Sequence, residues 1–600
     1  MHKNCMHKHC LQKASHLAAC GRVGGSAFLL RGSVVAVASA LAMLPVASAV
    51  AQTASPPDAG QIWRENQPPV PPQPRQGQST IQNQVQQPAS VPASSKQVTL
   101  AGFRFEGNHA FSDEELMALL PEAYRSGREF NVGLDQVLAL TGHITNHYRK
   151  HGYFVAVAYA GPQTISNRIL TISILEGEVD SIYVRENKSI IYSSHLIERI
   201  LNANYCGYSS CERTPVEQHH LERATGVVSD LPGMGAVSST LVPGKSVGTT
   251  QIGLSASPGK RYEGSVGLDN FGNRHIDRKR LLADLAINNL VGVGDRIHLT
   301  LNTSGSGLLG GGVGYSQLVG YKGLRLGGNY TYGTYELGGI YKSLSVKGNT
   351  HVFSPYASYP VIRRLENNLH LRASLDYKLL EDEILGSKTE KTATGYSLGL
   401  AGNSVDHVLG TSFNSYGLTW SSGKVKQADN ASNTSDSSLG SYDKLSYNLV
   451  RDQFLLAPAG HRVSLYGSLY GQTTDKNLVS SEKLALGGPS GVRAYPNGES
   501  GGDISMIGSL ELRYAIPIAA QTVLTTALFR DRGWQRVNEK PTSAQSEDNR
   551  RILSGSGASL SLNDTSFSAR LVYAKRDNNS QESTSDKDEG RWWLQAAWLF

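Results

Sequence analysis

Hydrophobic and polar side chains alternate with a period of two along most of the chain after about residue 259. Residues 368–378 show the pattern most fully, with one apolar set and one polar set: Leu369, Leu371, Ala373, Leu375 and Tyr377 against His370, Arg372, Ser374, Asp376 and Lys378. Residues 295–302 repeat it, and residues 592–600 end the chain with it. Successive side chains of a strand point to opposite faces, so the pattern predicts many strands with one apolar face and one polar face.

This alternation favours a transmembrane antiparallel β-barrel over a soluble β-sandwich. Tyr and Trp lie at strand ends on the apolar face, while ionic residues fill the other face throughout residues 258–600. Lipid outside the barrel and water inside it explain that arrangement. Spans of about 9 to 11 residues, with their turns and loops, fit about 16 strands into this length.

Residues 97–184 are predicted to form a small α+β domain, because the periodicity there changes between strand and helix. The expected order is a strand through 98–105, a helix beginning at the capping box of Ser112 and Glu115, a helix over 134–151, and strands over 154–159 and 169–175. The second helix is expected to bury one face, formed by Leu134, Val137, Leu138, Thr141, Ile144 and Tyr148.

Residues 185–257 repeat this order in outline. Helices are expected over 193–201 and 216–229, and strands over 237–241 and 250–255. The sequence therefore predicts two similar small domains in tandem before the barrel.

The first 51 residues are interpreted as an extended signal peptide. Basic residues precede the apolar run 33–50, and the small residues at 47–49 or 49–51 offer cleavage sites. A single membrane-spanning anchor is the alternative, which Pro45 and the small residues at the end of the run disfavour.

Residues 52–96 are rich in Pro, Gln and Ser and are expected to form an extended or mobile linker. Within the linker, residues 58–66 could form a helix of about two turns with Asp58 as its cap. Such a helix is marginal alone and would have to dock on another part of the chain.

The net charge of the chain bears on the class of its partner. The net charge is +7, but the first 51 residues hold five basic residues and no acidic ones, so the rest of the chain carries +2. This balance does not support a nucleic-acid partner.

Cys206 and Cys211 lie beyond the predicted signal, and a local disulfide is expected between them in an exported chain. Two free thiols or a thiol–metal site are the alternatives.

Two sequence motifs match known ligand-binding sites in residue type and spacing. Residues 305–310 read GSGLLG, but further glycines follow in place of the helix that a dinucleotide site requires, so a hairpin loop is expected. His143, His147 and His151 are spaced for zinc binding, yet they occupy the helix face opposite the apolar stripe and are expected to be solvated. No cofactor, metal or catalytic grouping is therefore predicted.

Two segments inside the barrel region differ from the alternating strands. Residues 483–503 form a long Gly-rich stretch with Arg493 at its centre, and residues 529–534 place Asp531 within a predicted strand. A loop folded into the lumen would bring the guanidinium to the carboxylate, a pairing that suits Arg. The alternative is an external loop with a solvated Arg493 and an unrelated Asp531.

Four segments, taken in order, resemble the two-partner secretion transporters, which are the haemolysin-activator-type members of the Omp85 superfamily: residues 221–244, 268–274, 480–503 and the terminal Phe600. The resemblance runs from about residue 97 to the end of the chain. It implies two POTRA domains at 97–184 and 185–257, followed by a sixteen-stranded barrel at 258–600.

The resemblance also implies roles for particular residues. The family's VRGY/F motif, on a loop inside the lumen, is matched by Val492, Arg493, Ala494 and Tyr495, where Ala494 replaces the usual Gly. The family's F-x-D-x-G strand motif, whose Asp pairs with the loop Arg, is matched by Phe529, Asp531 and Gly533.

Two further features resemble those of the family. Residues 58–66 lie where the family carries a helix that plugs the barrel. Trp598 and Phe600 resemble the C-terminal aromatic signal read by the barrel-assembly machinery.

The expected function is export of one large, unfolded exoprotein from the periplasm through the outer membrane, with the POTRA domains in the periplasm and lipid around the barrel. The client could be a haemolysin, an adhesin, a haem-binding protein or a contact toxin. A solute channel and an assembly factor for other membrane proteins are the alternatives. The first does not explain the tandem domains, and the second would usually carry more of them.

Overall fold

The computed structural model describes residues 56–66, 79–83, 97–125, 127–207, 211, 214–305, 307–428, 436–542, 549–584 and 586–600. The predicted signal peptide and its cleavage sites lie outside these residues. No helix in the described ranges is both long and apolar enough to cross a bilayer.

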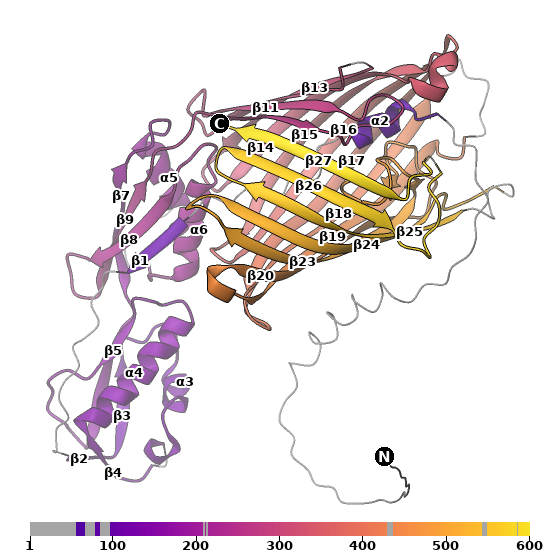
Figure 1. Cartoon of the computed structure of the whole chain (residues 1–600). Helices are drawn as coiled ribbons and strands as arrows, with labels where there is room; N and C mark the ends of the chain where they lie inside the picture. Colours follow the sequence, from indigo (N-terminus) through magenta and orange to yellow (C-terminus); the bar gives the residue numbers. More distant parts are fainter. Residues whose placement is uncertain are drawn as a thin grey trace, which may run out of the picture. The chain divides into compact units, whose positions relative to one another are not determined.

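Within the described residues, sixteen antiparallel strands close into a barrel (Figure 1). The first of these strands pairs with the last. The strands are β10 (Tyr262–Asp269), β11 (Arg280–Asn288), β12 (Arg296–Thr303), β13 (Leu308–Val319), β14 (Leu324–Glu336), β15 (Lys347–Arg363), β16 (Asn367–Ile384), β17 (Ser387–Asp406), β18 (Ser412–Gln427), β19 (Gly440–Leu456), β20 (Arg462–Thr474), β23 (Ile504–Pro517), β24 (Val523–Arg536), β25 (Arg550–Asn563), β26 (Phe567–Arg576) and β27 (Gly590–Leu599). This confirms the predicted barrel and excludes the sandwich.

The two faces of the strands follow the predicted alternation. On β16, Leu375 is 60% exposed on the outer face, whereas Lys378 is 9% exposed and points into the lumen. On β27, Trp598 is 59% exposed on the outside, whereas Trp593 is 4% exposed inside. Residues 305 and 307–310 lie in the β12–β13 turn and at the start of β13, as expected for a hairpin loop.

The first α+β domain contains the predicted elements and two additional short strands. Its elements are β2 (Gln97–Leu100), β3 (Gly102–Glu106), α3 (Asp113–Ala118), a 3-10 turn (Glu122–Tyr124), β4 (Phe130–Gly133), α4 (Leu134–Lys150), β5 (Val157–Tyr159) and β6 (Ile169–Leu175). The predicted strand at 98–105 is two strands, because β2 pairs with β4 while β3 pairs with β6.

The predicted apolar face of α4 was partly wrong. Leu134 and Leu138 are 40% and 42% exposed, whereas Leu140 is buried with the rest of the stripe. The helix packs on its sheet through the face that carries Val137 and Tyr148. In this orientation Leu134 and Leu138 point away from the core.

The second domain starts earlier than predicted. Its elements are β7 (Glu178–Asn187), α5 (Ser194–Tyr205), α6 (Gln218–Ser229), β8 (Val237–Pro243) and β9 (Thr249–Ala256). The predicted boundary at 184/185 cuts through β7, which pairs with β9 and therefore belongs to the second sheet. Only Glu176 and Gly177 separate β6 from β7, so the sequence offers no linker that marks the true boundary.

The predicted linker at 52–96 was also wrong in one part. Residues 79–83 form β1 (Ser79–Asn83), which pairs in parallel with β8 and completes the sheet order β1-β8-β9-β7. Ile81 packs against the apolar core of the second domain. Pairing with a distant strand supplies the stability that this polar segment lacks alone.

The second domain contacts one rim of the barrel through α6 and the turn that follows it. Arg363, the last residue of β15, donates from Nε and Nη2 to the carboxylate of Asp230 at 2.7 and 2.9 Å. Arg223 on α6 donates to the carbonyl of Pro360 at 2.9 Å. Gly226 lies so close that an added Cβ would be 2.8 Å from Cγ of Arg363.

Candidate functional site: the lumen loop and its helix

The segment between β20 and β23 folds into the barrel lumen and places Arg493 on the inner wall. Its backbone N donates to Asp531 Oδ2 at 3.0 Å, its Nε donates to the same oxygen at 2.8 Å, and its Nη2 donates to Oδ1 at 2.6 Å. Its Nη1 donates to Glu511 Oε1 at 2.7 Å. The two acids come from neighbouring strands, β23 and β24, which fixes the loop across that part of the wall.

This cluster is almost completely buried. Arg493 is 4% exposed and Asp531 is 0% exposed. Burial alone would lower the pKa of Arg493, but the hydrogen bonds and charges of Asp531 and Glu511 outweigh it and raise that pKa. Removing one partner from such a pair costs about 3–5 kcal/mol, because the other charge stays buried.

Aromatic groups complete the cluster. The guanidinium of Arg493 lies 3.4 Å from the ring centre of Phe529, a cation–π contact. Trp593 on β27 donates from Nε1 to the backbone oxygen of Arg493 at 2.7 Å. Val492 and Tyr495 are fully buried. The structure thus brings the VRGY/F-type loop residues together with the strand residue Phe529.

Small residues on the wall make room for the loop. A Cβ at Gly533 would lie 2.6 Å from Leu486 and 3.0 Å from Val492. A Cβ at Gly555 would lie 2.4 Å from Cβ of Ala494, so this glycine accommodates the methyl group that replaces the usual Gly of the motif. The substitution at Ala494 therefore packs without displacing the loop.

A short helix, α2 (Ala59–Glu65), lies inside the barrel against β14, β15 and β16 (Figure 1). Asp58 caps it by accepting a hydrogen bond from the backbone N of Gln61 at 2.9 Å, as the sequence predicts. The backbone N of Ala59 donates to Asp382 on β16 at 2.7 Å. These contacts with the barrel wall supply the stabilisation that so short a helix lacks on its own.

The helix is also bound to the base of the lumen loop. Arg64 donates from Nη1 to the backbone oxygens of Ser480 and Lys483 at 2.6 and 2.7 Å. The hydroxyl of Ser480 donates to Asp58 at 2.7 Å. Hydrogen bonds therefore join the helix to the base of the loop. The sequence alone did not predict this contact.

A buried acid links this assembly to the wall. Glu482 accepts hydrogen bonds from Lys378 on β16 at 2.5 Å and from Lys444 on β19 at 2.7 Å. Burial acts to raise the pKa of Glu482, but the two lysines outweigh it and lower that pKa, so the carboxylate stays charged. The Lys378 ammonium also lies 4.7 Å from the ring centre of Trp63 on α2. One lysine thus contacts wall, loop and helix together.

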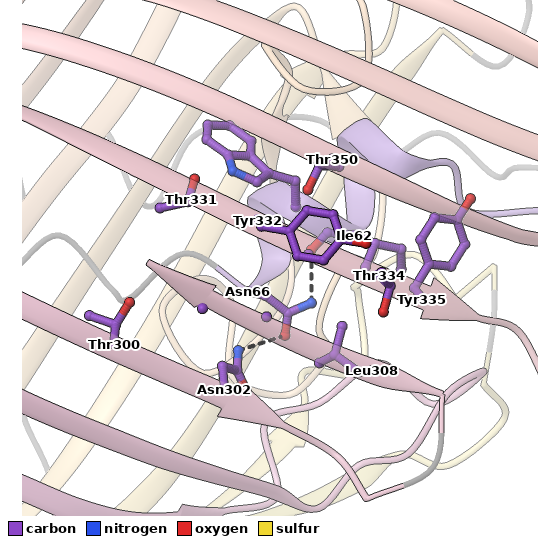
Figure 2. Close-up of a pocket in the computed structure, with 14 residues that line it drawn as sticks. Ile62, Asn66, Thr300, Asn302, Leu308, Thr331, Tyr332, Thr334, Tyr335 and Thr350 are labelled. Carbon is purple, nitrogen blue, oxygen red and sulfur yellow. Dashed lines mark hydrogen bonds between the residues drawn. The ribbon is translucent and has the colours of Figure 1, made fainter. Parts of the chain in front are cut away.

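A cavity of about 110 Å³ lies between α2 and strands β12 to β15 (Figure 2). Ile62, Trp63 and Asn66 line it from the helix, and small or polar residues line it from β12 to β15: Thr300, Asn302, Gly310, Thr331, Gly333, Tyr335 and Thr350. Asn66 accepts a hydrogen bond from Asn302 at 3.3 Å. The helix is therefore packed less closely on this side than on the loop side.

Other predicted residues lie away from the lumen. Cys206 and Cys211 are joined in a disulfide at the end of α5. Trp598 and Phe600 are exposed on the outer face, with ring centres 5.6 Å apart. His143 is exposed, whereas His147 is partly buried with its ring against Phe111, so the expected solvated face was wrong at His147.

Comparisons with known proteins agree with this architecture. A family model described as haemolysin secretion/activation protein ShlB/FhaC/HecB matches residues 248–562, and a ShlB-type POTRA domain model matches residues 98–177. The heme/hemopexin transporter protein HuxB of Haemophilus influenzae (strain 86-028NP) is 28% identical over 470 residues, which cover 77% of this chain and 80% of HuxB. The outer membrane transporter CdiB of Dickeya dadantii (strain 3937) is 23% identical over 382 residues, which cover 60% of this chain and 63% of CdiB.

Solved structures show the same fold. CdiB from Escherichia coli superposes with a TM-score of 0.68 at 17% identity, covering 86% of this chain and 93% of CdiB. CdiB from Acinetobacter baumannii gives a TM-score of 0.62 at 17% identity, covering 88% and 95%. Since the family model spans more than half of the sequence, the chain belongs to the haemolysin secretion/activation protein family, the outer-membrane transporters of two-partner secretion.

Proposed function

We propose that this protein captures one large, unfolded exoprotein in the periplasm and passes it through the barrel lumen to the cell surface. The observation that carries the proposal is the lumen loop, which Arg493 pins to the inner wall. A closed barrel with a polar inner face provides a path on which an extended chain meets few apolar contacts.

The lumen must be cleared before a chain can pass. Helix α2 and the base of the loop occupy it together, joined through Arg64, Ser480 and Glu482. We infer that α2 leaves the lumen during export while the Arg493 contacts hold or re-form the loop against the wall. The more loosely packed side of α2, next to the cavity, is where this movement meets least resistance.

Client recognition by strand addition fits the two sheets. Residues Val157–Tyr159 (β5) form an edge of the first sheet, where an extended segment could be added. The backbone N of Ala158 donates to the Thr145 hydroxyl on α4 at 2.9 Å, so a client strand would have to replace that contact. In the second sheet, the outer edge of β8 is paired with the chain's own β1. A client strand that uses the β8 edge would have to displace β1.

Folding of the client outside the cell is the driving force that we propose, because the sequence contains no nucleotide-binding motif. The family description and the relatives favour a haemolysin-type or haem-related exoprotein, with an adhesin or a contact toxin as further candidates. The exposed Trp598 and Phe600 are proposed as the signal for the barrel-assembly machinery.

The test compares the proteins in the medium and on the surface of cells with and without this chain. Loss of one very large polypeptide, restored by complementation, is the expected result and identifies the client. An unchanged set of secreted proteins, together with altered solute permeability or a broad loss of other barrels, would support a channel or an assembly factor instead.

A further inference from the structure

The start of α6 carries a cluster of metal-ligating side chains that the barrel and its loop do not use. Glu217 precedes the helix, and His219 and His220 lie in its first turn. One ligand atom from each of the three side chains lies within 4.8 Å of those of the other two. Within the described part of the chain, this is the one group of at least three such residues that meets this distance.

Glu217 is turned toward the histidines rather than toward the helix. It occupies the N-cap position, yet its side chain makes no capping hydrogen bond. Instead, its Oε2 lies 3.1 Å from Nδ1 of His219. A carboxylate at an N-cap would ordinarily accept hydrogen bonds from the free backbone N–H groups of the first turn, so this orientation leaves it available to a cation.

His220 supplies a second, independent observation. Its Nδ1 is buried and has no hydrogen-bond partner, while its ring lies 4.1 Å from the ring of His219 and 5.8 Å from that of Tyr205. A buried polar atom without a partner costs about 1–3 kcal/mol. A buried imidazole nitrogen without a hydrogen-bond partner is available as a metal ligand.

We propose that Glu217, His219 and His220 bind one Zn²⁺ ion, with the fourth coordination position left to water. Two imidazoles and one carboxylate are a ligand set that zinc accepts, whereas Ca²⁺ and Mg²⁺ require mostly oxygen ligands. With Zn–ligand distances of about 2.0–2.2 Å, the ligand atoms must approach to about 3.4 Å. The His219 side chain is 46% exposed and can rotate to close this distance.

The ion would lie where the two α+β domains are hydrogen-bonded to each other. The backbone N of Val216 donates to the oxygen of Gly177, and that of Gln218 donates to the oxygen of Gly152, both at 2.9 Å. The other end of α6 contacts the barrel through Asp230 and Arg363. A bound Zn²⁺ therefore stiffens the first turn of the helix that connects the first domain to the barrel rim.

Isothermal titration of ZnCl₂ into the untagged, EDTA-treated full chain in detergent tests the proposal, with the variant His219→Ala/His220→Ala alongside. The parent is expected to bind one equivalent more than this variant, and the difference separates the site from every other histidine in the chain. The matched control, His143→Ala/His147→Ala on α4, is expected to keep the parent's stoichiometry. Glu217→Gln should weaken binding by at least the roughly 10- to 100-fold that loss of an outer-shell partner costs.

Equal zinc stoichiometry and affinity in the parent and the double variant would overturn the proposal. Zinc K-edge absorption of the parent loaded with one equivalent provides a second measurement that needs no variant. A spectrum with two imidazole ligands and oxygen supports the site. A spectrum without imidazole ligands, or with sulfur ligands, overturns it.

Discussion

Arg493 donates three hydrogen bonds to the carboxylate of Asp531, which lies 38 residues further along the chain. One of the three comes from the backbone, so the pairing fixes the path of the loop as well as the position of its side chain. Glu511 takes the remaining side of the guanidinium. A single cation thereby anchors the loop to two neighbouring strands, β23 and β24.

Arg493→Ala is expected to reduce export strongly while the barrel still assembles. The change leaves Asp531 buried without its partner, at a cost of about 3–5 kcal/mol to the docked position of the loop. Export is measured as the amount of client in the medium, and barrel assembly as heat-dependent migration on a gel. Arg493→Lys should be intermediate, because a lysine keeps the charge but loses the forked geometry.

Arg530→Ala is the matched control for this experiment. Arg530 precedes Asp531 on the same strand, but its side chain is 64% exposed. Its loss should leave export unchanged, because Arg530 alternates with the inward-facing Phe529 and Asp531 and therefore points away from the lumen. Normal export by Arg493→Ala would remove the role assigned to the loop.

Glu482→Gln is expected to release α2 from the lumen. Without the carboxylate, Lys378 and Lys444 repel each other at the base of the loop, and breaking such a buried pair costs about 3–5 kcal/mol. The result should be a higher basal conductance of the purified protein in planar bilayers. Labelling of a cysteine introduced at Gln61 with a membrane-impermeant maleimide should also become faster.

Glu381→Gln serves as the comparison for Glu482→Gln. Glu381 lies on β16 near Lys378, but its partner Lys388 is 66% exposed on its side chain. Conductance and labelling should therefore stay at parental values. If both variants behave alike, the coupling of helix, loop and wall through Glu482 is wrong.

The fold could be predicted from the sequence because its main constraint is local. Lipid on one face and water on the other determine every second residue of a spanning strand, as Leu375 and Lys378 illustrate. The resemblance to a known family, rather than spacing, pointed to Arg493 and Asp531. Separation along the chain does not show which of many arginines and aspartates meet across a lumen.

The contacts of the helix could not be predicted, because they depend on closure of the barrel. Lys378, Lys444 and Glu482 each follow the general rule for a polar lumen residue, and no local pattern links two strands to one loop. The strand β1 was missed for a related reason. Its five residues contain one large apolar side chain, Ile81, and become a strand only by pairing with β8.

Removal of the disulfide is expected to destabilise the second α+β domain. Cys206 and Cys211 close a short loop at the end of α5, and the loop-entropy relation gives about 2 kcal/mol for a ring of this size. The second domain of Cys206→Ser/Cys211→Ser should therefore unfold at a lower denaturant concentration than that of the parent. Hydrogen exchange of the α5 amides measures this change. Parental exchange rates in α5 would show that the bond contributes nothing to the domain.

Ile81→Asp is expected to detach β1 from the edge of β8. Ile81 is partly buried against the apolar core of the second domain, so the substitution places a charge beside that core, where it loses water without gaining a partner. Hydrogen exchange should then become faster at those amides of residues 237–241 that face β1, while β9, paired on both sides, keeps its protection.

Thr80→Asp is the matched control, because Thr80 is exposed and its side chain can carry a charge in solvent. Faster exchange in both variants would mean that charge on the segment, rather than the Ile81 contact, weakens the pairing. Unchanged exchange in Ile81→Asp would show that β1 contributes no protection to the β8 edge, and that edge would then be available to a client without any displacement.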